Sequence, residues 1–244
     1  MQPKGSRPLQ NLLLGGLSYD TQKRIRPHLK PVELPLGGVI YESGQHIDYV
    51  YFPIDSIVSL LYVTASGDSA EIAIVGRDGV VGVSVILGAD STLNQAVVQS
   101  QGLAYRMPVS QLKAELRNHP EVRTRMLRYT QALMTQMSQT AVCNRHHSIQ
   151  QQLCRWLLLS LDRLPDNHVN MTHELIANML GVQREGVTQA ASKLQRLGAI
   201  RYRRGHITVI DRPLLEQMSC ECYGVVKRET DRLEHSGSTT AAPL

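Results

Sequence analysis

The spacing of apolar residues changes twice along this chain of 244 residues. Between residues 31 and 108, short apolar or alternating runs are separated by turn-forming residues, and nine of the 18 glycines lie in this stretch. Short runs with evenly spaced turns predict the strands of a β-barrel or β-roll. The predicted strands span residues 39–41, 49–52, 56–63, 70–75, 80–86, 95–99 and 103–107.

Outside this stretch the apolar residues recur at helical spacing. The predicted helices span residues 18–29, about two turns from residue 110, residues 121–144 and residues 149–164. Pro120 favours a helix start because proline is tolerated in a first helical turn. The only tryptophan, Trp156, lies in the last of these helices and is the expected centre of a second core.

Residues 172–197 predict two short helices joined by a tight turn. Gly181 lies where the chain must turn, and glycine adopts a left-handed conformation at little cost. In the second helix Val187, Ala191 and Leu194 share one face. The opposite face carries the hydrogen-bonding side chains Glu185, Thr188, Gln189 and Ser192. Such a helix suits the major groove of DNA, where base edges display donors and acceptors.

The charge around this pair of helices strengthens the interpretation. From residue 186 to residue 210 there is no Asp or Glu, and the five basic residues are Lys193, Arg196, Arg201, Arg203 and Arg204. Residues 200–210 alternate around Arg204-Gly205, which predicts a β-ribbon or wing with His206 at its tip. A solvated basic helix pair is the alternative. The wing and the one-sided charge favour binding to DNA phosphates.

Composition indicates two domains with different partners. Residues 31–108 hold eight acidic and two basic residues, although the whole chain has a net charge of +5. No run of 18 apolar residues predicts a membrane span, and the N-terminus lacks the apolar core of a signal peptide. We therefore expect a cytoplasmic protein whose four cysteines are reduced.

An acidic β-roll, a long helix and a winged helix-turn-helix resemble the Crp/Fnr family of bacterial transcription regulators over about residues 17–223. Residues 181–189, Gly-Val-Gln-Arg-Glu-Gly-Val-Thr-Gln, are similar to the family's recognition pattern Gly-x-Ser-Arg-Glu-Thr-Val-x-Arg. Gln183, Gly186 and Gln189 depart from that pattern, which alters the expected DNA preference. Glutamine reads adenine more readily than guanine, whereas arginine prefers guanine.

The resemblance and the helix pattern together suggest individual roles. The expected base readers are Arg184, Glu185, Thr188 and Gln189, of which the first two match base-reading positions of the family. The expected phosphate contacts are Thr172, His173, Ser192, Lys193, Arg203 and Arg204, of which the first two resemble phosphate-contacting positions of the family.

Paired DNA readers imply a dimer, because palindromic sites present two copies of a half-site. In the predicted helix over residues 121–144, Met126, Leu133, Met137 and Ala141 follow one another at spacings of 7, 4 and 4. This narrow seam is typical of a coiled-coil contact between two chains. The alternative is that it packs on the β-roll of the same chain.

The β-roll resembles the family's cyclic-nucleotide domain, but its ligand chemistry differs. Nucleotide-binding members carry Gly-Glu for the ribose and Arg-Ser for the phosphate, whereas this chain has Gly82-Val83 and, near the second position, Asn94-Gln95. A buried phosphate without its arginine is an unpaired charge, which is costly. We therefore expect a degenerate pocket that does not bind cyclic AMP, unless Arg77 or Arg106 reaches it from another strand. A cyclic-nucleotide sensor is the alternative.

Cysteines and histidines allow a third interpretation. Iron–sulfur members of the family use cysteines near the N-terminus, but the first cysteine here is Cys143. Cys220 and Cys222 could share a metal or respond to oxidants. Two ligands are too few for a structural zinc site without help, so a surface pair on a late helix is the favoured interpretation. His146 and His147 interrupt the apolar pattern and mark the expected hinge. We predict no metal, no cofactor and no enzyme activity, and a redox- or metal-responsive regulator is the alternative.

The sequence therefore predicts an α+β chain with a double-stranded β-roll of the cyclic-nucleotide-binding jelly-roll type, a long dimerisation helix and a C-terminal winged helix-turn-helix. The expected parts are a tail over residues 1–16, the roll over 17–120, the helix and hinge over 121–145, the DNA-binding domain over 146–225 and a disordered tail over 226–244. The expected partners are a palindromic DNA operator and a second copy of the chain, with RNA polymerase as a candidate. The sequence identifies no effector and no membrane partner.

Overall fold

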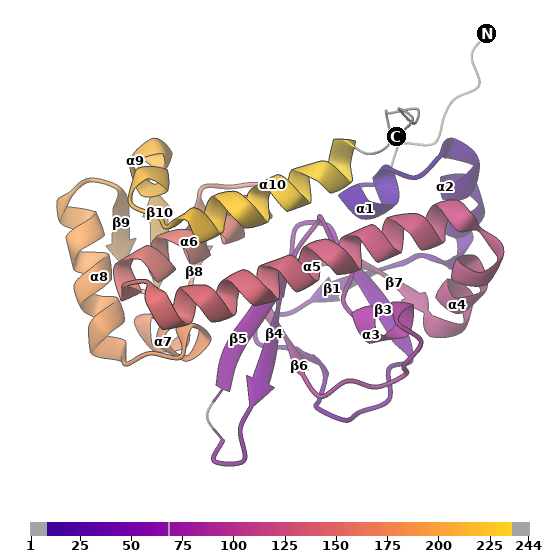
Figure 1. The fold of residues 1–244 in the computed structure, drawn as a ribbon, viewed down its shortest axis with the longest axis horizontal. Helices are drawn as coiled ribbons and strands as arrows, with labels where there is room; N and C mark the ends of the chain where they lie inside the picture. Colours follow the sequence, from indigo (N-terminus) through magenta and orange to yellow (C-terminus); the bar gives the residue numbers. More distant parts are fainter. Residues whose placement is uncertain (1–8, 68, 236–244) are drawn as a thin grey trace, which may run out of the picture.

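The computed structural model describes residues 9–67 and 69–235. Figure 1 shows a β-roll at one end, a small helical domain at the other, and helix α5 (Pro120–His146) extending along both. Helix α10 (Glu221–His235) lies alongside α5 and returns from the small domain toward the roll. Within the described ranges, every helix is too short or too polar to cross a lipid bilayer.

The roll consists of two antiparallel sheets with strand orders β1-β7-β3 and β2-β6-β4-β5. The strands are β1 (Lys30–Leu34), β2 (Val39–Tyr41), β3 (Tyr49–Pro53), β4 (Ile57–Val63), β5 (Ser69–Val75), β6 (Gln95–Ser100) and β7 (Gly102–Pro108). Side chains alternate between the two faces of a strand, and the inward-facing Val50, Phe52 and Leu60 are completely buried. The predicted β-roll is confirmed.

One predicted strand was wrong, and one observed strand was not predicted. The strand expected over residues 80–86 is instead a single bridge from Val81 to Tyr51, followed by the short helix α3 (Val83–Ile86). Between them Gly82 takes a φ of +103°, which ends the extended backbone. Strand β1 was not predicted, because Pro31 interrupts its pattern. β1 is an edge strand of its sheet, which is where a proline is tolerated in a sheet.

The N-terminal tail predicted over residues 1–16 was wrong for the part that the structure describes. Helix α1 (Leu12–Gly15) inserts Leu13 and Leu14 into the core of the roll. The buried Asn11 side chain donates to the carbonyls of Pro53 and Gly79, both at 2.9 Å. The short elements α2 (Tyr19–Ile25) and η1 (Arg26–His28) follow. Residues 1–8 lie outside the described ranges.

The apolar seam predicted for dimerisation packs within one chain instead. Met126 and Leu133 are 1% and 4% exposed and belong to the core of the roll, and Met137 packs against that core. Only Ala141 of the predicted seam is exposed. The narrow apolar stripe of α5 covers the roll, so the alternative interpretation of that stripe is the correct one. Helix α4 (Val109–Asn118) leads into α5.

A different face of α5 carries exposed apolar side chains. Leu127, Met134 and Val142 are 48%, 55% and 46% exposed. Leu127, Met134 and Ala141 are spaced seven residues apart, which is the period of a coiled-coil stripe.

The small C-terminal domain is built around Trp156. Its elements are α6 (Ile149–Leu161), β8 (His168–Asn170), α7 (His173–Leu180), α8 (Arg184–Arg196), β9 (Ile200–Arg203), β10 (His206–Val209) and α9 (Arg212–Gln217). Its core also takes in Ile57, Leu61 and Ile74 of the roll. The two domains therefore share one hydrophobic interface along β4 and β5.

The disordered tail predicted from residue 226 was wrong up to residue 235, because α10 continues through that stretch. Val226 and Leu233, seven residues apart, are buried against the C-terminal core and the core of the roll, respectively. These contacts stabilise a helix that its charged composition alone does not predict. Residues 236–244 lie outside the described ranges.

Candidate nucleic-acid interface

Helices α7 and α8 form the predicted helix-turn-helix. The Thr172 hydroxyl accepts a hydrogen bond from the backbone N–H of Leu175 at 3.3 Å and so caps α7. Gly181 ends α7 with a φ of +64°, a conformation that glycine adopts without strain. The sequence therefore determines both ends of the first helix through local chemistry.

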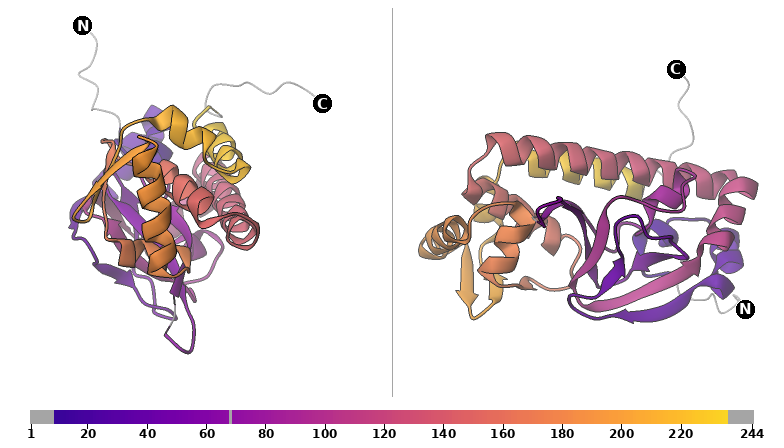
Figure 2. Two further views of the ribbon diagram at one scale, coloured as in Figure 1. Left: turned by 90° about the vertical axis from the view of Figure 1, so that its left-hand side faces the viewer. Right: turned by 90° about the horizontal axis from the view of Figure 1, so that it is seen from below.

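Helix α8 has one buried and one exposed face. Val187, Ala191 and Leu194 are buried in the C-terminal core. The expected base readers Arg184, Glu185, Thr188 and Gln189 are all exposed, as are Ser192 and Lys193. Figure 2 shows α8 at the surface of this end of the molecule. The helix therefore presents a polar face to any ligand that approaches this end.

The exposed face is partly ordered by its own contacts. The Thr188 hydroxyl donates to the carbonyl of Arg184 at 3.0 Å and lies 3.1 Å from Nδ1 of His173. The Arg184 guanidinium lies 3.8 Å from the Glu174 carboxylate. Both groups are exposed, so water screens this ion pair and a phosphate or a base could displace it.

His173 lies beneath this face and not on top of it. The imidazole is half-buried and stacks on the Tyr202 ring at a centroid distance of 4.0 Å. Burial and, to a lesser extent, the Arg184 charge lower the pKa of His173. A neutral imidazole could donate a hydrogen bond to phosphate but would not supply a positive charge. A phosphate contact by His173 stays a prediction.

The predicted wing is present as the β9–β10 hairpin, in which Arg203 pairs with His206. Arg204 at its tip has a φ of +47°, the one positive φ of a non-glycine residue in the described ranges. This conformation is strained for a side chain with a Cβ. The tip thus holds basic groups in a fixed turn. The exposed basic side chains on and beside the wing are Lys193, Arg196, Arg201, Arg203, Arg204 and His206.

Close packing between α6 and α8 explains the glycine at position 186. A Cβ at this position would lie 2.5 Å from Cδ1 of Ile149. Helix α6 therefore approaches the first turn of α8 more closely than a threonine would allow without a shift of Ile149. The departure from the family pattern at residue 186 accompanies a tighter contact between α6 and α8.

The start of α8 faces a groove shared with the roll. Residues that line this groove are Gly67 and Ser69 of the β4–β5 hairpin and Asn178, Gln183 and Arg184 of the helix-turn-helix. At its edge, the Ala70 methyl lies 3.7 Å from where a Cβ on Gly181 would stand. The β4–β5 hairpin of the roll therefore lies beside the start of α8.

The four residues expected in a degenerate ligand pocket are engaged within the roll. The Tyr41 hydroxyl donates to Oδ1 of Asn94 at 3.3 Å, and Nε2 of Gln95 donates to a Glu42 carboxylate oxygen at 2.6 Å. The buried Tyr41 ring lies beside Asn94. Gly82 is packed against Val50, and Val83 begins α3.

Neither candidate rescue arginine lies beside these residues. The Arg106 guanidinium lies 4.7 Å from the centre of the Tyr49 ring, in the other sheet. Arg77 lines a cavity between the roll and the C-terminal domain, together with Arg163 and Asp162.

The interface between the domains contains a buried carboxyl group that the sequence analysis did not single out. The Trp156 indole donates to one oxygen of Glu71 at 3.1 Å, and the other oxygen lies 2.5 Å from the Ser59 hydroxyl. The same hydroxyl lies 2.9 Å from Oε1 of Gln99, whose amide donates to Ser160 at 3.3 Å. Burial raises the pKa of Glu71 to about 7.

The geometry of this network favours the protonated carboxyl group. A hydroxyl carries one hydrogen and cannot donate to both Glu71 and Gln99. If Glu71 is protonated, it donates to Ser59, and Ser59 then donates to Gln99. An acidic residue within the apolar run over residues 70–75 was the one sequence signal for this group.

The expected surface pair of Cys220 and Cys222 was wrong, because both side chains are buried. The two expected hinge histidines also differ, since His146 is exposed and His147 is half-buried. The tertiary fold brings His147 and both cysteines together with Cys143.

A β-roll, a long helix that extends along both domains, and a winged helix-turn-helix with a basic surface define a DNA-binding regulator. Comparison with known domains agrees: residues 31–119 match the cyclic nucleotide-binding domain, and residues 151–218 match the Crp-like helix-turn-helix domain. The chain belongs to the Crp/Fnr family of DNA-binding transcription regulators.

Solved structures share this fold at low sequence identity. FixK2 from Bradyrhizobium japonicum is 17% identical, with a TM-score of 0.66, over 79% of this chain and 98% of FixK2. A CRP-family transcriptional regulator from Thermus thermophilus is 17% identical, with a TM-score of 0.64, over 77% and 96% of the two chains. The c-di-GMP responsive regulator CLP from Xanthomonas campestris is 14% identical, with a TM-score of 0.62, over 79% and 99%. No curated protein matches the chain.

Proposed function

We propose that the protein binds a palindromic DNA operator as a homodimer, with α8 of each copy in the major groove. Arg184, Glu185, Thr188 and Gln189 read bases in this proposal. Thr172, His173, Ser192, Lys193, Arg203 and Arg204 contact phosphates. The observation that carries the proposal is the division of α8 into a buried apolar face and an exposed polar face, bordered by basic side chains that attract phosphate.

The expected base preference follows from the side chains. Arg184 can form two hydrogen bonds to guanine, whereas Gln189 pairs best with adenine. The family pattern has arginine at the position of Gln189, so the operator of this protein should differ from the usual family half-site. Selection of bound sequences from a random DNA library would identify it.

Arg184→Ala tests the assignment directly. Loss of a bidentate base contact should cost about 1–3 kcal/mol at the selected operator and relax preference at one position of each half-site. Lys193→Ala should instead weaken all sequences alike and reduce the salt dependence of binding. Both effects can be measured by fluorescence anisotropy at two salt concentrations.

The matched control is Arg117→Ala, because Arg117 is an exposed arginine on α4, away from α8. It should leave affinity and preference unchanged. If Arg184→Ala kept the wild-type preference and affinity, α8 would not be the reading helix.

Dimerisation is proposed through the exposed face of α5. Leu127, Met134 and Ala141 repeat every seven residues, and all three are exposed in the described chain. A second α5 packed against this face would bury the stripe and pair the two recognition helices. Half-sites should then be centred about 34 Å apart or a multiple of that distance. RNA polymerase is a candidate further partner at the promoter.

We propose that the roll does not bind cyclic AMP. The supporting observations are the absence of the usual glutamate at Val83 and the engagement of Asn94 and Gln95 by Tyr41 and Glu42. The Glu42 carboxylate beside Gln95 would also repel a phosphate. A cyclic-nucleotide-responsive regulator is the alternative. We further propose that the protein acts in the cytoplasm by binding and not by catalysis.

A further inference from the structure

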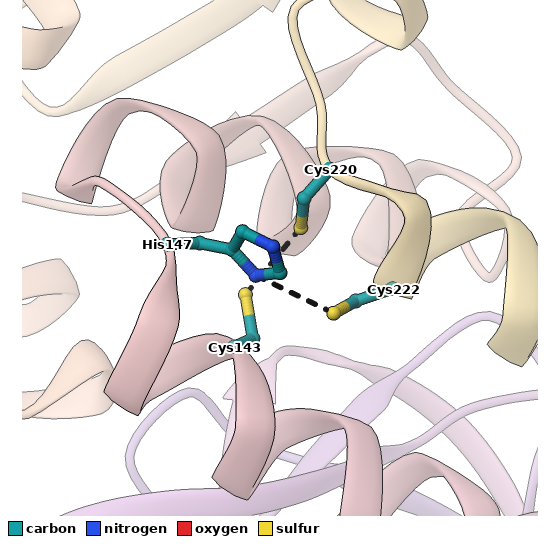
Figure 3. A group of neighbouring side chains, drawn as sticks. All are labelled: Cys143, His147, Cys220 and Cys222. Carbon is teal, nitrogen blue, oxygen red and sulfur yellow. Dashed lines mark hydrogen bonds between the residues drawn. The ribbon is translucent and has the colours of Figure 1, made fainter.

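Four side chains converge on one point where α5 ends and α10 begins (Figure 3). Cys143 lies near the end of α5, His147 directly follows that helix, and Cys220 and Cys222 lie at the start of α10. One potential ligand atom from each residue lies within 4.8 Å of the other three. Across residues 9–67 and 69–235, this is the one group of cysteine, histidine and acidic side chains arranged to hold a metal ion.

The separations match a tetrahedral site. Sγ of Cys143 lies 3.5 Å from Sγ of Cys220, and Sγ of Cys222 lies 3.6 Å from Nδ1 of His147. Zinc–sulfur bonds of about 2.3 Å place two ligand sulfurs about 3.7 Å apart in a tetrahedron. An iron–sulfur cluster is larger, because each iron atom binds its own cysteine. The group therefore fits one ion and not a four-iron cluster.

The surroundings of His147 are those of a metal ligand. While Nδ1 faces the sulfurs, Nε2 lies 3.3 Å from a carboxylate oxygen of Glu221. Histidines that bind metals usually donate their second N–H to a carboxylate, which fixes the ring and its tautomer. The Gln152 amide also donates to the carbonyl of His147 at 3.0 Å and holds the backbone.

Ordinary packing does not account for the group. Buried cysteines usually behave as small hydrophobic residues. Cys143, Cys220 and Cys222, however, form a cluster of their own, separate from the aliphatic cores of both domains. Three cysteines this close together suit a shared metal ion, which each of them would bind as the thiolate.

We propose that Cys143, His147, Cys220 and Cys222 bind one Zn²⁺ or a similar soft divalent ion. Metal binding displaces the thiol protons to solvent, so the affinity falls at low pH. The ion links the start of α10 to the end of α5. Because α6 begins at Ile149, occupancy sets the position of the helix-turn-helix relative to the roll. This second step rests on the proposed DNA-binding function.

Cobalt titration tests the site. The reduced, chelator-treated full-length protein should bind one Co²⁺ per chain under argon, with visible d–d bands of a tetrahedral site and thiolate-to-cobalt charge-transfer absorption. Zn²⁺ should displace it, and the zinc-loaded protein should unfold at a higher temperature, because a ligand stabilises the state that binds it.

Matched variants separate the ligands from their neighbours. Cys143→Ser, Cys222→Ser and His147→Ala should each lose stoichiometric binding. Cys154→Ala and His146→Ala should keep it, because Cys154 lies in the C-terminal core and His146 is exposed. Glu221→Gln should weaken binding about 10- to 100-fold. Circular dichroism identifies variants that fail to fold, and the wild-type stoichiometry decides the question if they do.

Three results would overturn the site. They are a wild-type protein that binds no Co²⁺ or Zn²⁺, binding that persists in the ligand variants, and an iron–sulfur chromophore in place of a single ion.

Measurements of DNA binding test separately whether the metal ion sets the position of the helix-turn-helix. Zinc removal should change operator affinity at least tenfold, and Cys154→Ala should respond as the wild type does. If cobalt binds but operator affinity is unchanged, the proposed effect of the metal on the helix-turn-helix is wrong, whereas the metal site is supported. If neither the loaded nor the metal-free protein binds any DNA, the proposed function fails, whereas the cobalt spectrum still supports the metal site.

Discussion

Two surfaces of the molecule carry polar residues at positions where Crp/Fnr proteins meet their ligands, and these surfaces differ in what the residues contact. On α8, the side chains of Glu185 and Gln189 are exposed to solvent. In the roll, Asn94 and Gln95 are engaged by Tyr41 and Glu42. The side chains on α8 are free to contact an external partner, whereas those in the roll are hydrogen-bonded within the chain.

The difference indicates how a fold can keep one binding surface and lose another. Asn94 would have to break its buried hydrogen bond with Tyr41 before it could bind a ligand, and a buried group left unsatisfied costs about 1–3 kcal/mol. An exposed side chain gives up only water. Residue identity at a site is therefore less informative than the contacts of the residue within the folded chain.

The largest expected effect concerns the exposed face of α5, which has no partner in the described chain. Leu127→Lys combined with Met134→Lys should convert the dimer to a folded monomer, because like charges would meet across the interface. Operator affinity should then fall at least 100-fold, since the second half-site is no longer bound intramolecularly. Light scattering and gel shifts measure the two effects.

Leu133→Lys is the contrasting variant, because Leu133 is buried in the core of the roll. It should disrupt folding, which circular dichroism detects. A wild-type protein that stayed monomeric at micromolar concentration and bound its operator fully would contradict dimerisation through α5.

An intermediate effect concerns Glu71, the buried carboxyl group at the interface between the two domains. Its pKa of about 7 lies above the usual value of about 4.3 in an unfolded chain. Between these values the folded state binds more protons, so the free energy of unfolding should decrease as pH rises from about 4.3 to 7 and level off above. The decrease should be of the order of 3 kcal/mol.

Urea unfolding at several pH values checks this prediction. Glu71→Gln should flatten the profile, because the amide does not titrate. The exposed Glu33 offers a control, since Glu33→Gln should leave the slope unchanged. An unaltered slope in Glu71→Gln would assign the pH dependence to other groups.

The smallest expected effect is on nucleotide binding, where we predict none. Calorimetric titration with cyclic AMP or cyclic GMP should give no measurable heat at micromolar concentrations. A phosphate without an arginine partner loses several kcal/mol, and each 1.4 kcal/mol weakens affinity about tenfold. A micromolar dissociation constant would remove the contrast between the two surfaces and restore the cyclic-nucleotide alternative.

Local chemistry allowed the sequence to determine the DNA-binding end of the chain. Thr172 and Gly181 fix the ends of α7, and the alternation around Arg204-Gly205 fixes the wing, because caps and turns depend on residues only a few positions apart. The exposure of the predicted base readers followed from helical periodicity alone. The α+β class and the long helix were predictable for the same reason.

Other features depended on contacts between distant segments. Periodicity showed that α5 has an apolar stripe, but only the tertiary structure decided that Met126 and Leu133 face their own roll. The helical state of residues 226–235 likewise depends on burial of Val226 and Leu233 against two separate cores.

The group of three cysteines and one histidine shows most clearly what sequence patterns cannot predict. The sequence supplied Cys220 and Cys222 as a pair with too few ligands, and spacing along the chain gave no link to Cys143 or His147. That link requires α10 to return along α5, which brings residues 77 positions apart to a sulfur–sulfur distance of 3.5 Å. Local patterns determine helices, turns and exposed faces, whereas the packing of whole elements decides which side chains meet.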